Sequence, residues 1–455
     1  FQIMLYQNLR KIVPSADSQP LSSFIHDLLR RKLLSCTHPE FPYKQQDITA
    51  YSSTLPNVLY AGVDPTADSL HLGNLLVLNS LIRASFFGCS PILLIGKATA
   101  SVGDPSGHKR DRKLLLHEFI YANSKALQIQ VEKIKANVSS LYGEDISLEI
   151  RNNAEWYKEM RILDFFESTK RFRMSDMLKS GPIKSRLDDC ETLSYAEFSY
   201  QTLQAIDWLK LYEERGCLCQ IGGTDQFGNM RAGFEHIRAN TERLSIALCM
   251  PLLTDKNGRK LGKSSDQNGG TAPLWLDQLK TSAFAFYQHL RQLHDDAAEH
   301  FLVSFSLRKI TEVEDVLEEH RNNLGKWVAQ IHLAEEMTAI VHGKAALERA
   351  KKCSKILFDG ASSSELENLN PDEITEMFGS ASTFEIVCGS IKTMGDLAAM
   401  TKQDGINLMR AGALKINGTK ATDPEEKIDL ERILINGRFT IVCWGRRKFS
   451  LIKWS

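Results

Sequence analysis

The chain has 455 residues, of which 43% are hydrophobic and 25% charged, and its formal net charge is zero because 56 basic residues balance 56 acidic ones. This length predicts about two to four domains. The composition favours a globular protein without a membrane span, since no run of ~18 apolar residues occurs. Nine cysteines without a CxxC pair argue against a disulfide framework and against a zinc site. We therefore expect free thiols, no bound metal and, if nucleic acid is bound, a local basic patch.

The first 24 residues contain several serines and few charges, which are Arg10, Lys11 and Asp17. A basic, serine-containing and acid-poor start is typical of a mitochondrial transit peptide. A disordered extension is the alternative. We treat residues 1–24 as an N-terminal extension and a candidate transit peptide.

Helical and strand patterns alternate from residue 25 to residue 280. Apolar periodicity predicts helices and short apolar runs predict buried strands. The segments in chain order are a helix from Phe24 to Leu34, a strand over 57–65, a helix over 71–88, a strand over 91–101, a helix over 197–216 and a strand over 217–223. Strand, helix and strand within about forty residues form one βαβ unit with a right-handed crossover. The prediction is an α/β fold, with a doubly wound, Rossmann-like parallel sheet over 25–280.

The remaining sequence changes character twice. Residues 281–360 are helical in period, residues 361–380 are a linker rich in Ser and Asn, and residues 381–455 combine two small helices with short alternating strands. The end of the chain is basic, with aromatic residues between the charges, as in RNA-binding modules. The basic residues are Arg438, Arg446, Arg447, Lys448 and Lys453, and the aromatic ones are Trp444, Phe449 and Trp454. A solvated surface is the alternative.

The segment from Tyr60 to Asn74, YAGVDPTADSLHLGN, leads from a strand through a turn into a helix. Gly62 allows a ligand to approach the backbone. His71 lies where the helix begins, and the helix N-terminus is expected to offer unpaired N–H groups to a phosphate. Taken by itself, this histidine could equally be a satisfied turn residue.

The segment GRKLGKSS, from Gly258 to Ser265, resembles a phosphate-binding loop, but only three residues separate its glycines where a P-loop requires four. Lys260 and Lys263 could still reach a triphosphate on flexible stems. A solvated lysine loop is the alternative.

In this order, HLGN and KLGKS resemble the HIGH and KMSKS motifs of class I aminoacyl-tRNA synthetases. The similarity extends through GDPSG at 103–107, SYQTLQAID at 199–207 and IGGTDQFGN at 221–229, which resemble tyrosyl-tRNA synthetases of the bacterial and organellar type. Residues 415–428 and 435–454 resemble the S4-like RNA-binding domain of that family, which implies an S4-like domain over 381–455 and an α-helical anticodon-binding domain over 281–360. The resemblance covers nearly the whole chain from about residue 25.

A tyrosine site is implied by this resemblance and agrees with the helical spacing. Tyr200, Gln204 and Asp207 stand at i, i+4 and i+7, so they share one helix face, and polar groups on a buried face need partners. The family implies that Tyr60 and Asp207 bind the phenol hydroxyl. It implies that Asp104, Tyr200 and Gln204 hold the α-ammonium group, that Gln220 lies beneath the substrate and that Gln226 lies near its carboxylate.

The ATP site is implied by the same resemblance. Its residues are Gly62, Asp64, His71, Gly73, Gly223, Asp225, Lys109, Arg112, Lys260 and Lys263. The catalytic group comprises Thr66, His71, Asn74, Lys260, Lys263 and Ser264. No protein nucleophile is required, because the tyrosine carboxylate attacks the α-phosphate in line while the protein positions the reactants and stabilises the pyrophosphate. Magnesium is expected to accompany ATP as part of the substrate, and no tightly bound cofactor is expected.

Two positions depart from the family pattern. Asn74 replaces the second histidine of HIGH, although an amide can also donate to an oxygen. His108 follows GDPSG where a lysine is common, and an unperturbed histidine is mostly neutral at pH 7.

The resemblance predicts a homodimeric tyrosine–tRNA ligase of the mitochondrial matrix that uses L-tyrosine, ATP and tRNA(Tyr) and has no membrane partner. One alternative is a tryptophanyl-tRNA synthetase, although Asp207 opposite Tyr60 suits a phenol better than an indole. The other is an RNA-binding scaffold without catalysis, against which His71, Asp225, Lys260 and Lys263 argue.

Overall fold

The computed structural model describes residues 19–41, 45–105, 115–178, 181–188, 192–252, 273–358, 374, 383–445 and 448–455. Its internal packing divides the chain into two compact units, one of residues 1–275 with 296–329 and the other of residues 276–295 with 330–455. Several predicted features lie outside the described residues. They are most of the N-terminal extension, almost all of the linker, the side chain of Lys448, and Lys109, Arg112, Lys260, Lys263, Ser264, Arg446 and Arg447.

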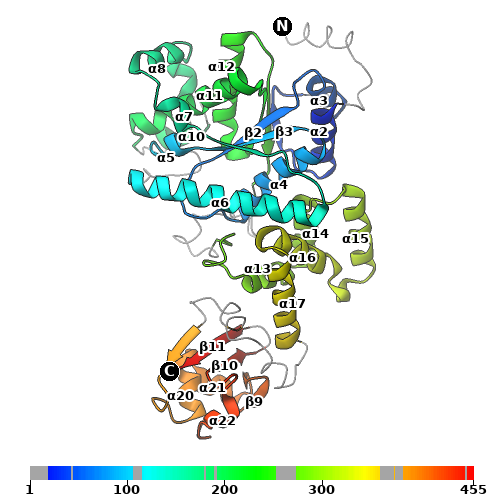
Figure 1. Ribbon diagram of the computed structural model, residues 1–455, viewed down its shortest axis with the longest axis vertical. Helices are drawn as coiled ribbons and strands as arrows, with labels where there is room; N and C mark the ends of the chain where they lie inside the picture. The colour runs from blue at the N-terminus through cyan, green and yellow to red at the C-terminus, as the bar shows by residue number, and fades with distance from the viewer. Residues whose placement is uncertain are drawn as a thin grey trace. The chain divides into compact units, whose positions relative to one another are not determined.

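A six-stranded sheet forms the centre of the first unit, with the strand order β1-β6-β5-β2-β3-β4 (Figure 1). Its strands are β1 (Cys36–His38), β2 (Val58–Val63), β3 (Ser90–Ile95), β4 (Glu149–Asn152), β5 (Cys219–Gly223) and β6 (Ile246–Met250). All neighbours are parallel except β1, which is antiparallel to β6. The strands β3 and β4 follow β2 toward one edge of the sheet, and β6 follows β5 toward the other edge. The order in which strands are added therefore reverses between β2 and β5. The predicted doubly wound sheet is confirmed.

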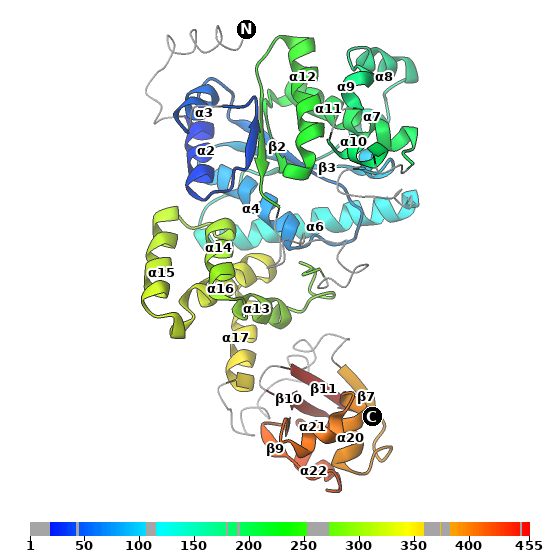
Figure 2. The same ribbon diagram turned by 180° about the vertical axis from the view of Figure 1, so that it is seen from behind.

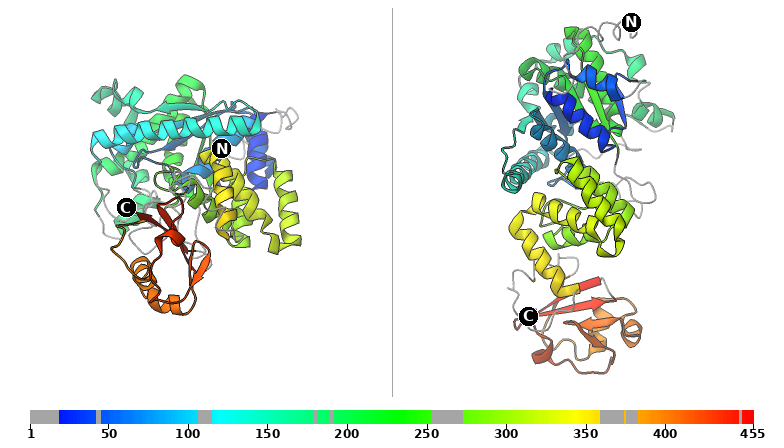
Figure 3. Two further views of the ribbon diagram at one scale, coloured as in Figure 1. Left: turned by 60° about the horizontal axis from the view of Figure 1, so that its bottom comes forward. Right: turned by 90° about the vertical axis from the view of Figure 1, so that its right-hand side faces the viewer.

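Helices cover both faces of this sheet. The helices are α2 (Pro20–Arg30), α3 (Gln45–Ser52), α4 (Leu72–Phe86), α5 (Lys97–Ala100), α6 (His117–Tyr142), α7 (Ala154–Tyr157), α8 (Ile162–Thr169), α9 (Met174–Met177), α10 (Gly181–Asp188), α11 (Tyr195–Arg215), η2 (Thr224–Gln226) and α12 (Phe227–Thr241). Figures 1 and 2 show α4 and α6 on one side of the sheet and α11 and α12 on the other. Figure 3 shows α6 as one long helix.

The element boundaries differ from the predicted ones by several residues, most of all in the first helix and at the end of β3. Helix α2 begins at Pro20 rather than Phe24, because proline is tolerated at the first helical position, where an N–H would have no partner. Strand β3 ends at Ile95, and the residues after it form the short helix α5 instead of more strand. None of the described helices is long and apolar enough to cross a membrane. Every cysteine that the structure describes is a free thiol, as predicted.

Residues 283–358 are helical, as the sequence predicted. They form α13 (Ala283–Arg291), α14 (Asp295–Phe305), α15 (Ile310–Asn322), η4 (Leu324–Lys326), α16 (Val328–His342) and α17 (Lys344–Phe358). The division into two units falls within this segment, since residues 296–329 belong to the first unit. The proposed boundaries of three separate domains therefore remain a prediction.

Within the first unit, buried arginines of α4 and of the end of α2 hold the end of α14. Arg31 donates to the carbonyls of Val303 and Arg308, and Arg83 donates to those of Ser304 and Ser306 at 3.0 and 2.7 Å. Guanidinium groups suit this position because the last carbonyls of a helix lack intrahelical donors and carry partial negative charge.

The C-terminal module contains a five-stranded sheet of order β7-β11-β10-β8-β9. Its elements are β7 (Thr383–Ile386), α20 (Met394–Thr401), α21 (Gly405–Arg410), β8 (Leu414–Ile416), β9 (Thr419–Ala421), α22 (Leu430–Ile433), β10 (Phe439–Trp444) and β11 (Lys448–Trp454). Strands β10 and β11 form its central antiparallel pair (Figure 3). This α+β module has its own hydrophobic core, which includes Leu397, Val442 and Ile452.

Candidate active site

Two buried polar side chains mark the switch point of the sheet. Tyr60 on β2 is paired with Gln220 on β5, so their side chains point to the same face. The residues are 1% and 3% exposed, yet the Tyr60 hydroxyl and the Gln220 Oε1 atom have no hydrogen-bond partner among the described residues. Ligands of open α/β sheets bind at this kind of position. Because buried polar atoms are nearly always paired, these two atoms indicate a polar ligand.

Helix α11 supplies the predicted polar face. It begins with a capping box between Ser194 and Glu197 and ends at Gly216, whose φ of 68° suits a glycine. Tyr200 and Asp207 are buried on this helix, and Gln204 between them is half-buried. The expectation that one helix face buries polar groups is confirmed.

Asp207 is a buried carboxylate held by neutral donors. Asn153 Nδ2 donates to it at 3.1 Å and Trp156 Nε1 at 2.9 Å. Burial raises its pKa from 3.8 to about 7, against the lowering effect of these donors. Burial, followed by the charge of Asp207, also raises the pKa of Tyr60 well above its usual value. Asp207 and Tyr60 therefore interact electrostatically.

Sequence reasoning missed Asn153 and Trp156. Both follow the carboxyl end of β4, and residues at the carboxyl ends of parallel strands meet at one edge of the sheet. Their position after a strand was the available signal, but β4 itself was not predicted.

A second carboxylate, Asp64, lies in the same network. It accepts a hydrogen bond from Thr99 Oγ1 at 2.7 Å and another from the Tyr200 hydroxyl at 2.9 Å. Asn153 donates to Thr99 Oγ1 at 3.1 Å, which links Asp64 to Asp207. Thr99 was not predicted as a site residue. Tyr200, which the family resemblance assigned to the α-ammonium group, is oriented here by Asp64.

Glycines give this network its close packing. A Cβ atom at Gly96 would overlap the carboxylate of Asp64 and the hydroxyl of Thr99, so only glycine fits there. A Cβ atom at Gly62 would meet only the carbonyl oxygen of Leu94, at 3.9 Å. The backbone of Gly62 is thus accessible to a ligand, as the sequence predicted.

The residues predicted to bind the ammonium group and the carboxylate of the substrate also contact each other. Gln226 Nε2 donates to Asp104 Oδ2 at 2.7 Å, and Asn229 donates to Gln226 Oε1 at 3.0 Å. Gln226 lies in η2, directly after Gly223 at the end of β5, and Asp225 lies in the same turn. The backbone N–H of Thr66 donates to the carbonyl of Asp64 at 2.8 Å, which closes the turn after β2.

The start of α4 corrects one expectation. His71 is the N-cap, and its Nδ1 accepts from the N–H of Gly73 at 3.0 Å, while Asn74 Oδ1 accepts from the N–H of His71. The N–H of Leu72 donates to the carbonyl of Leu274. These N–H groups at the start of α4 are already paired, so the prediction that they are free to bind a phosphate is wrong. Because Nδ1 is an acceptor, the neutral imidazole carries its proton on Nε2.

The aromatic residues of the basic C-terminal strip also need correction. Trp444 and Trp454 are 5% and 4% exposed and belong to the hydrophobic core of the module, so they are not positioned to stack on RNA. Every residue of β10, including Trp444, is buried, and the side chain of Phe449 lies outside the described residues. Lys453 forms an ion pair with Glu385 at 2.9 Å, whereas Arg438 is exposed.

The described residues contain no cluster of three or more His, Cys, Asp or Glu side chains that could hold a metal ion. The polar groups at the switch point are carboxylates, amides and hydroxyls, with one histidine at a helix start. They suit a zwitterionic ligand with a hydroxyl group better than a tightly bound metal.

Comparisons with known proteins identify the family of the chain. The family model described as tRNA synthetases class I (W and Y) matches residues 52–359. The mitochondrial tyrosine–tRNA ligase of Rattus norvegicus is 34% identical over 88% of this chain and 85% of its own length. The tyrosine–tRNA ligase of Oceanobacillus iheyensis is 36% identical over 87% of this chain and 91% of its own length. The C-terminally truncated mitochondrial tyrosyl-tRNA synthetase of Aspergillus nidulans is 28% identical, with a TM-score of 0.65 over 74% of this chain and 94% of that one.

Proposed function

The chain belongs to the class I tRNA synthetases, in the tyrosine branch of bacterial and mitochondrial type, and on this premise we propose how its residues act. It is an aminoacyl-tRNA ligase that joins tyrosine to tRNA in mitochondria. In the first step the tyrosine carboxylate attacks the α-phosphate of ATP, forming tyrosyl-adenylate as pyrophosphate leaves. In the second, a 3′-terminal hydroxyl of tRNA(Tyr) takes the tyrosyl group and releases AMP.

The unpaired polar atoms of Tyr60 and Gln220 carry the proposal for the tyrosine site. A para-hydroxyl placed near Tyr60 and Asp207 would donate to the carboxylate and accept from the Tyr60 hydroxyl. Phenylalanine would leave the Tyr60 hydroxyl unpaired and would deprive Asp207 of one donor, at a cost of about 1–3 kcal/mol for an unpaired buried group. Asn153 and Trp156 position Asp207 and leave it lone pairs for the substrate.

The other end of the amino acid would lie at Asp104, Gln204 and Gln226. Asp104 offers a carboxylate to the ammonium group, and Gln226 Nε2 can turn from Asp104 to the substrate carboxylate. The carboxylate would then face the α-phosphate, and the protein would contribute by positioning.

For ATP, which enters with its Mg²⁺, we propose that Gly62 and Asp64 lie near the adenosine and that Gly223 and Asp225 lie near the ribose. His71 is oriented by its Nδ1 bond to Gly73, so Nε2–H is the atom that would stabilise phosphate charge. Lys260 and Lys263 would act on the leaving pyrophosphate, with Lys109 and Arg112 on a second phosphate-binding segment.

Three further properties belong to the proposal. We place the enzyme in the mitochondrial matrix, a location supported by the acid-poor first 24 residues and by the names of its relatives. The C-terminal module would be an S4-like domain that binds tRNA through Arg438, Arg446, Arg447 and Lys448. The chain would be a homodimer joined through exposed apolar residues of the first unit.

Amino-acid-dependent exchange of pyrophosphate into ATP tests the activation step. We expect exchange with tyrosine and at most about one hundredth of it with phenylalanine or tryptophan, because each would leave buried acceptors or donors without partners. The change Asp207→Ala should abolish exchange, whereas Asp315→Ala on α15 is the control. Faster exchange with tryptophan than with tyrosine would overturn the assignment.

A further inference from the structure

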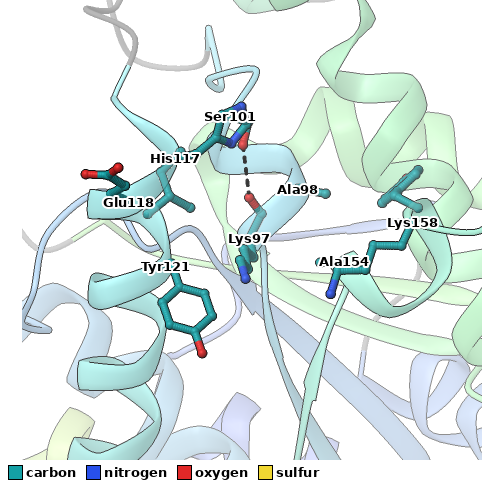
Figure 4. A pocket seen from close by; sticks show the side chains of 10 residues that line it. Lys97, Ala98, Ser101, His117, Glu118, Tyr121, Ala154 and Lys158 are labelled. Atoms are coloured by element: carbon teal, nitrogen blue, oxygen red, sulfur yellow. Dashed lines mark hydrogen bonds between the residues drawn. The ribbon is translucent and has the colours of Figure 1, made fainter.

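A cavity of about 690 Å³ lies beside the tyrosine site, and its described lining includes none of the described residues assigned to tyrosine or ATP. Its walls come from α5, the first turn of α6 and the end of α7 (Figure 4). Strands β3 and β4 lead directly into α5 and α7, so the cavity lies at the same carboxyl edge of the sheet as the tyrosine site. A volume of this size suits a ligand as large as a nucleotide.

The cavity combines two amines with aromatic surface. Figure 4 shows the side chains of Lys97 and Lys158 extending into the hollow from α5 and from the end of α7. Lys97 Nζ lies 4.2 Å from the ring centroid of Tyr121, which is 60% exposed. In the part of the chain that the structure describes, neither amine has a carboxylate within ion-pair distance, although Glu118 and His117 line the rim. Two lysines without a described carboxylate partner favour a phosphate, and the exposed ring beside them favours a planar group such as a base attached to that phosphate.

The walls of the cavity are connected to the tyrosine site. In α5, Ala98 N donates to Asn153 Oδ1 at 2.8 Å, and Thr99 donates to Asp64. In α7, Trp156 donates to Asp207, and its neighbour Tyr157 lines the cavity while its hydroxyl donates to the carbonyl of Leu203 at 2.8 Å. A ligand bound in the cavity would therefore lie next to the site where the adenylate forms.

We propose that this cavity holds an unpaired nucleotide of the 3′ end of tRNA, with its phosphate between Lys97 and Lys158 and its base against Tyr121. The proposal rests on the proposed function, which requires a single-stranded tRNA end to reach the adenylate. Base stacking on an aromatic ring and a phosphate on lysines are the usual contacts of single-stranded RNA. A free nucleotide offers the same chemistry, and the experiment separates the two sources.

The test compares full-length variants in two reactions. Lys97→Met and Lys158→Met remove the amines, Tyr121→Ala removes the ring and Tyr121→Phe keeps it. Lys133→Met on the exposed part of α6 removes the same charge away from the cavity. We expect pyrophosphate exchange without tRNA to stay within about twofold in all of them. We expect kcat/KM for tRNA in charging to fall about tenfold for each lysine variant and for Tyr121→Ala, but not for Tyr121→Phe or Lys133→Met.

Binding of tRNA trimmed of its last unpaired nucleotides identifies the part of the RNA concerned. Wild type and Lys97→Met should bind trimmed tRNA equally, whereas intact tRNA should distinguish them. A loss that persists with trimmed tRNA, or that Lys133→Met reproduces, would overturn the proposal in favour of general charge attraction. Inhibition of exchange by AMP in wild type but not in Lys97→Met would assign the cavity to a free nucleotide instead.

The outcome for this cavity is distinguishable from the outcome for the proposed function. Absence of tyrosine-dependent exchange in wild type would contradict the function. Normal exchange together with unchanged charging in the lysine variants would contradict only the cavity proposal.

Discussion

At the scale of single residues, Asp207 is the most informative group, because its carboxyl is buried and accepts hydrogen bonds from the neutral donors Asn153 and Trp156. Its pKa in the folded chain is about 7, against 3.8 for the ordinary group. Between these values the folded chain binds a proton that the unfolded chain has lost. Stability from this group is therefore present at low pH and is lost as pH rises from about 4 through about 7.

The change Asp207→Asn should abolish this pH dependence because an amide does not titrate. We expect the melting temperature of the variant, relative to wild type, to be several degrees higher at pH 8.5 than at pH 5. Thermal unfolding at the two pH values measures this difference, with Asp315→Asn on the surface of α15 as control. If the melting temperatures of the variant and of wild type differ by the same amount at both pH values, Asp207 does not titrate in this range.

The sequence predicted those site residues that a local pattern brings together, and it missed those that only the alignment of distant strands brings together. Tyr200, Gln204 and Asp207 share a face because helical spacing is local. Thr99 and Asn153 reach Asp64 and Asp207 only after strands far apart in sequence are aligned in the sheet, and no local pattern contains that alignment. The assignment of phosphate donors to α4 was wrong because the capping bonds of His71 and Asn74 use them.

At the scale of elements, α14 depends on side chains from helices distant in sequence. Arg31 and Arg83 are 2% exposed and donate to the carbonyls of Val303 and Ser304 in its last turn. Asp27 accepts from Arg31 at 2.7 Å. The sequence predicted these helices from their apolar period, but two arginines in amphipathic helices look like surface residues until the partner helix is known.

Replacing Arg83 with Met should destabilise the attachment of α14, because it removes the donor to the carbonyl of Ser304 and one of the two arginine donors to that of Ser306, at a cost of about 1–3 kcal/mol. Hydrogen exchange of the amides in α14 and α15 should accelerate, while the amides of α20 serve as an internal reference. The matched control is Arg321→Met, since Arg321 is 62% exposed in its ion pair with Glu299 and surface pairs contribute about 1 kcal/mol or less. Equal acceleration in both variants would contradict the role assigned to Arg83.

At the scale of the whole molecule, exposed apolar residues support the proposal of a homodimer. Ile162, Leu163 and Phe166 on α8 are 68%, 76% and 50% exposed and lie on one side of the helix, and Met174 on α9 is 65% exposed. Large side chains grouped in this way on a surface mark interaction sites.

If the chain forms the proposed dimer through α8, the double change Leu163→Glu and Phe166→Glu should yield monomers, because it would bury charges in the interface. Sedimentation velocity at micromolar concentration measures the mass. The change Leu279→Glu provides a control, since Leu279 is 91% exposed and lies in the other unit. A wild-type monomer, or a double variant that remains dimeric, would exclude this surface as the interface.

The C-terminal module gives the last prediction, because the described residues that form its hydrophobic core lie between Ile386 and Trp454. Removing residues 380–455 should preserve tyrosine-dependent pyrophosphate exchange, since every described residue of the tyrosine site lies between Tyr60 and Gln226. It should abolish most charging at low tRNA concentration, because binding of RNA phosphates supplies much of the affinity.

A milder variant separates charge from folding within the same module. Changing Arg438, Arg446 and Arg447 together to Gln leaves the buried Trp444 and Trp454 in place. It should weaken tRNA binding and flatten its salt dependence by about one logarithmic slope unit for each phosphate that is no longer neutralised. Arg432→Gln is the control, because Arg432 already forms an exposed ion pair with Glu426 at 3.4 Å. If the triple variant binds tRNA with unchanged affinity and salt slope while truncation still abolishes charging, the module binds RNA through another face, and the basic strip is a solvated surface.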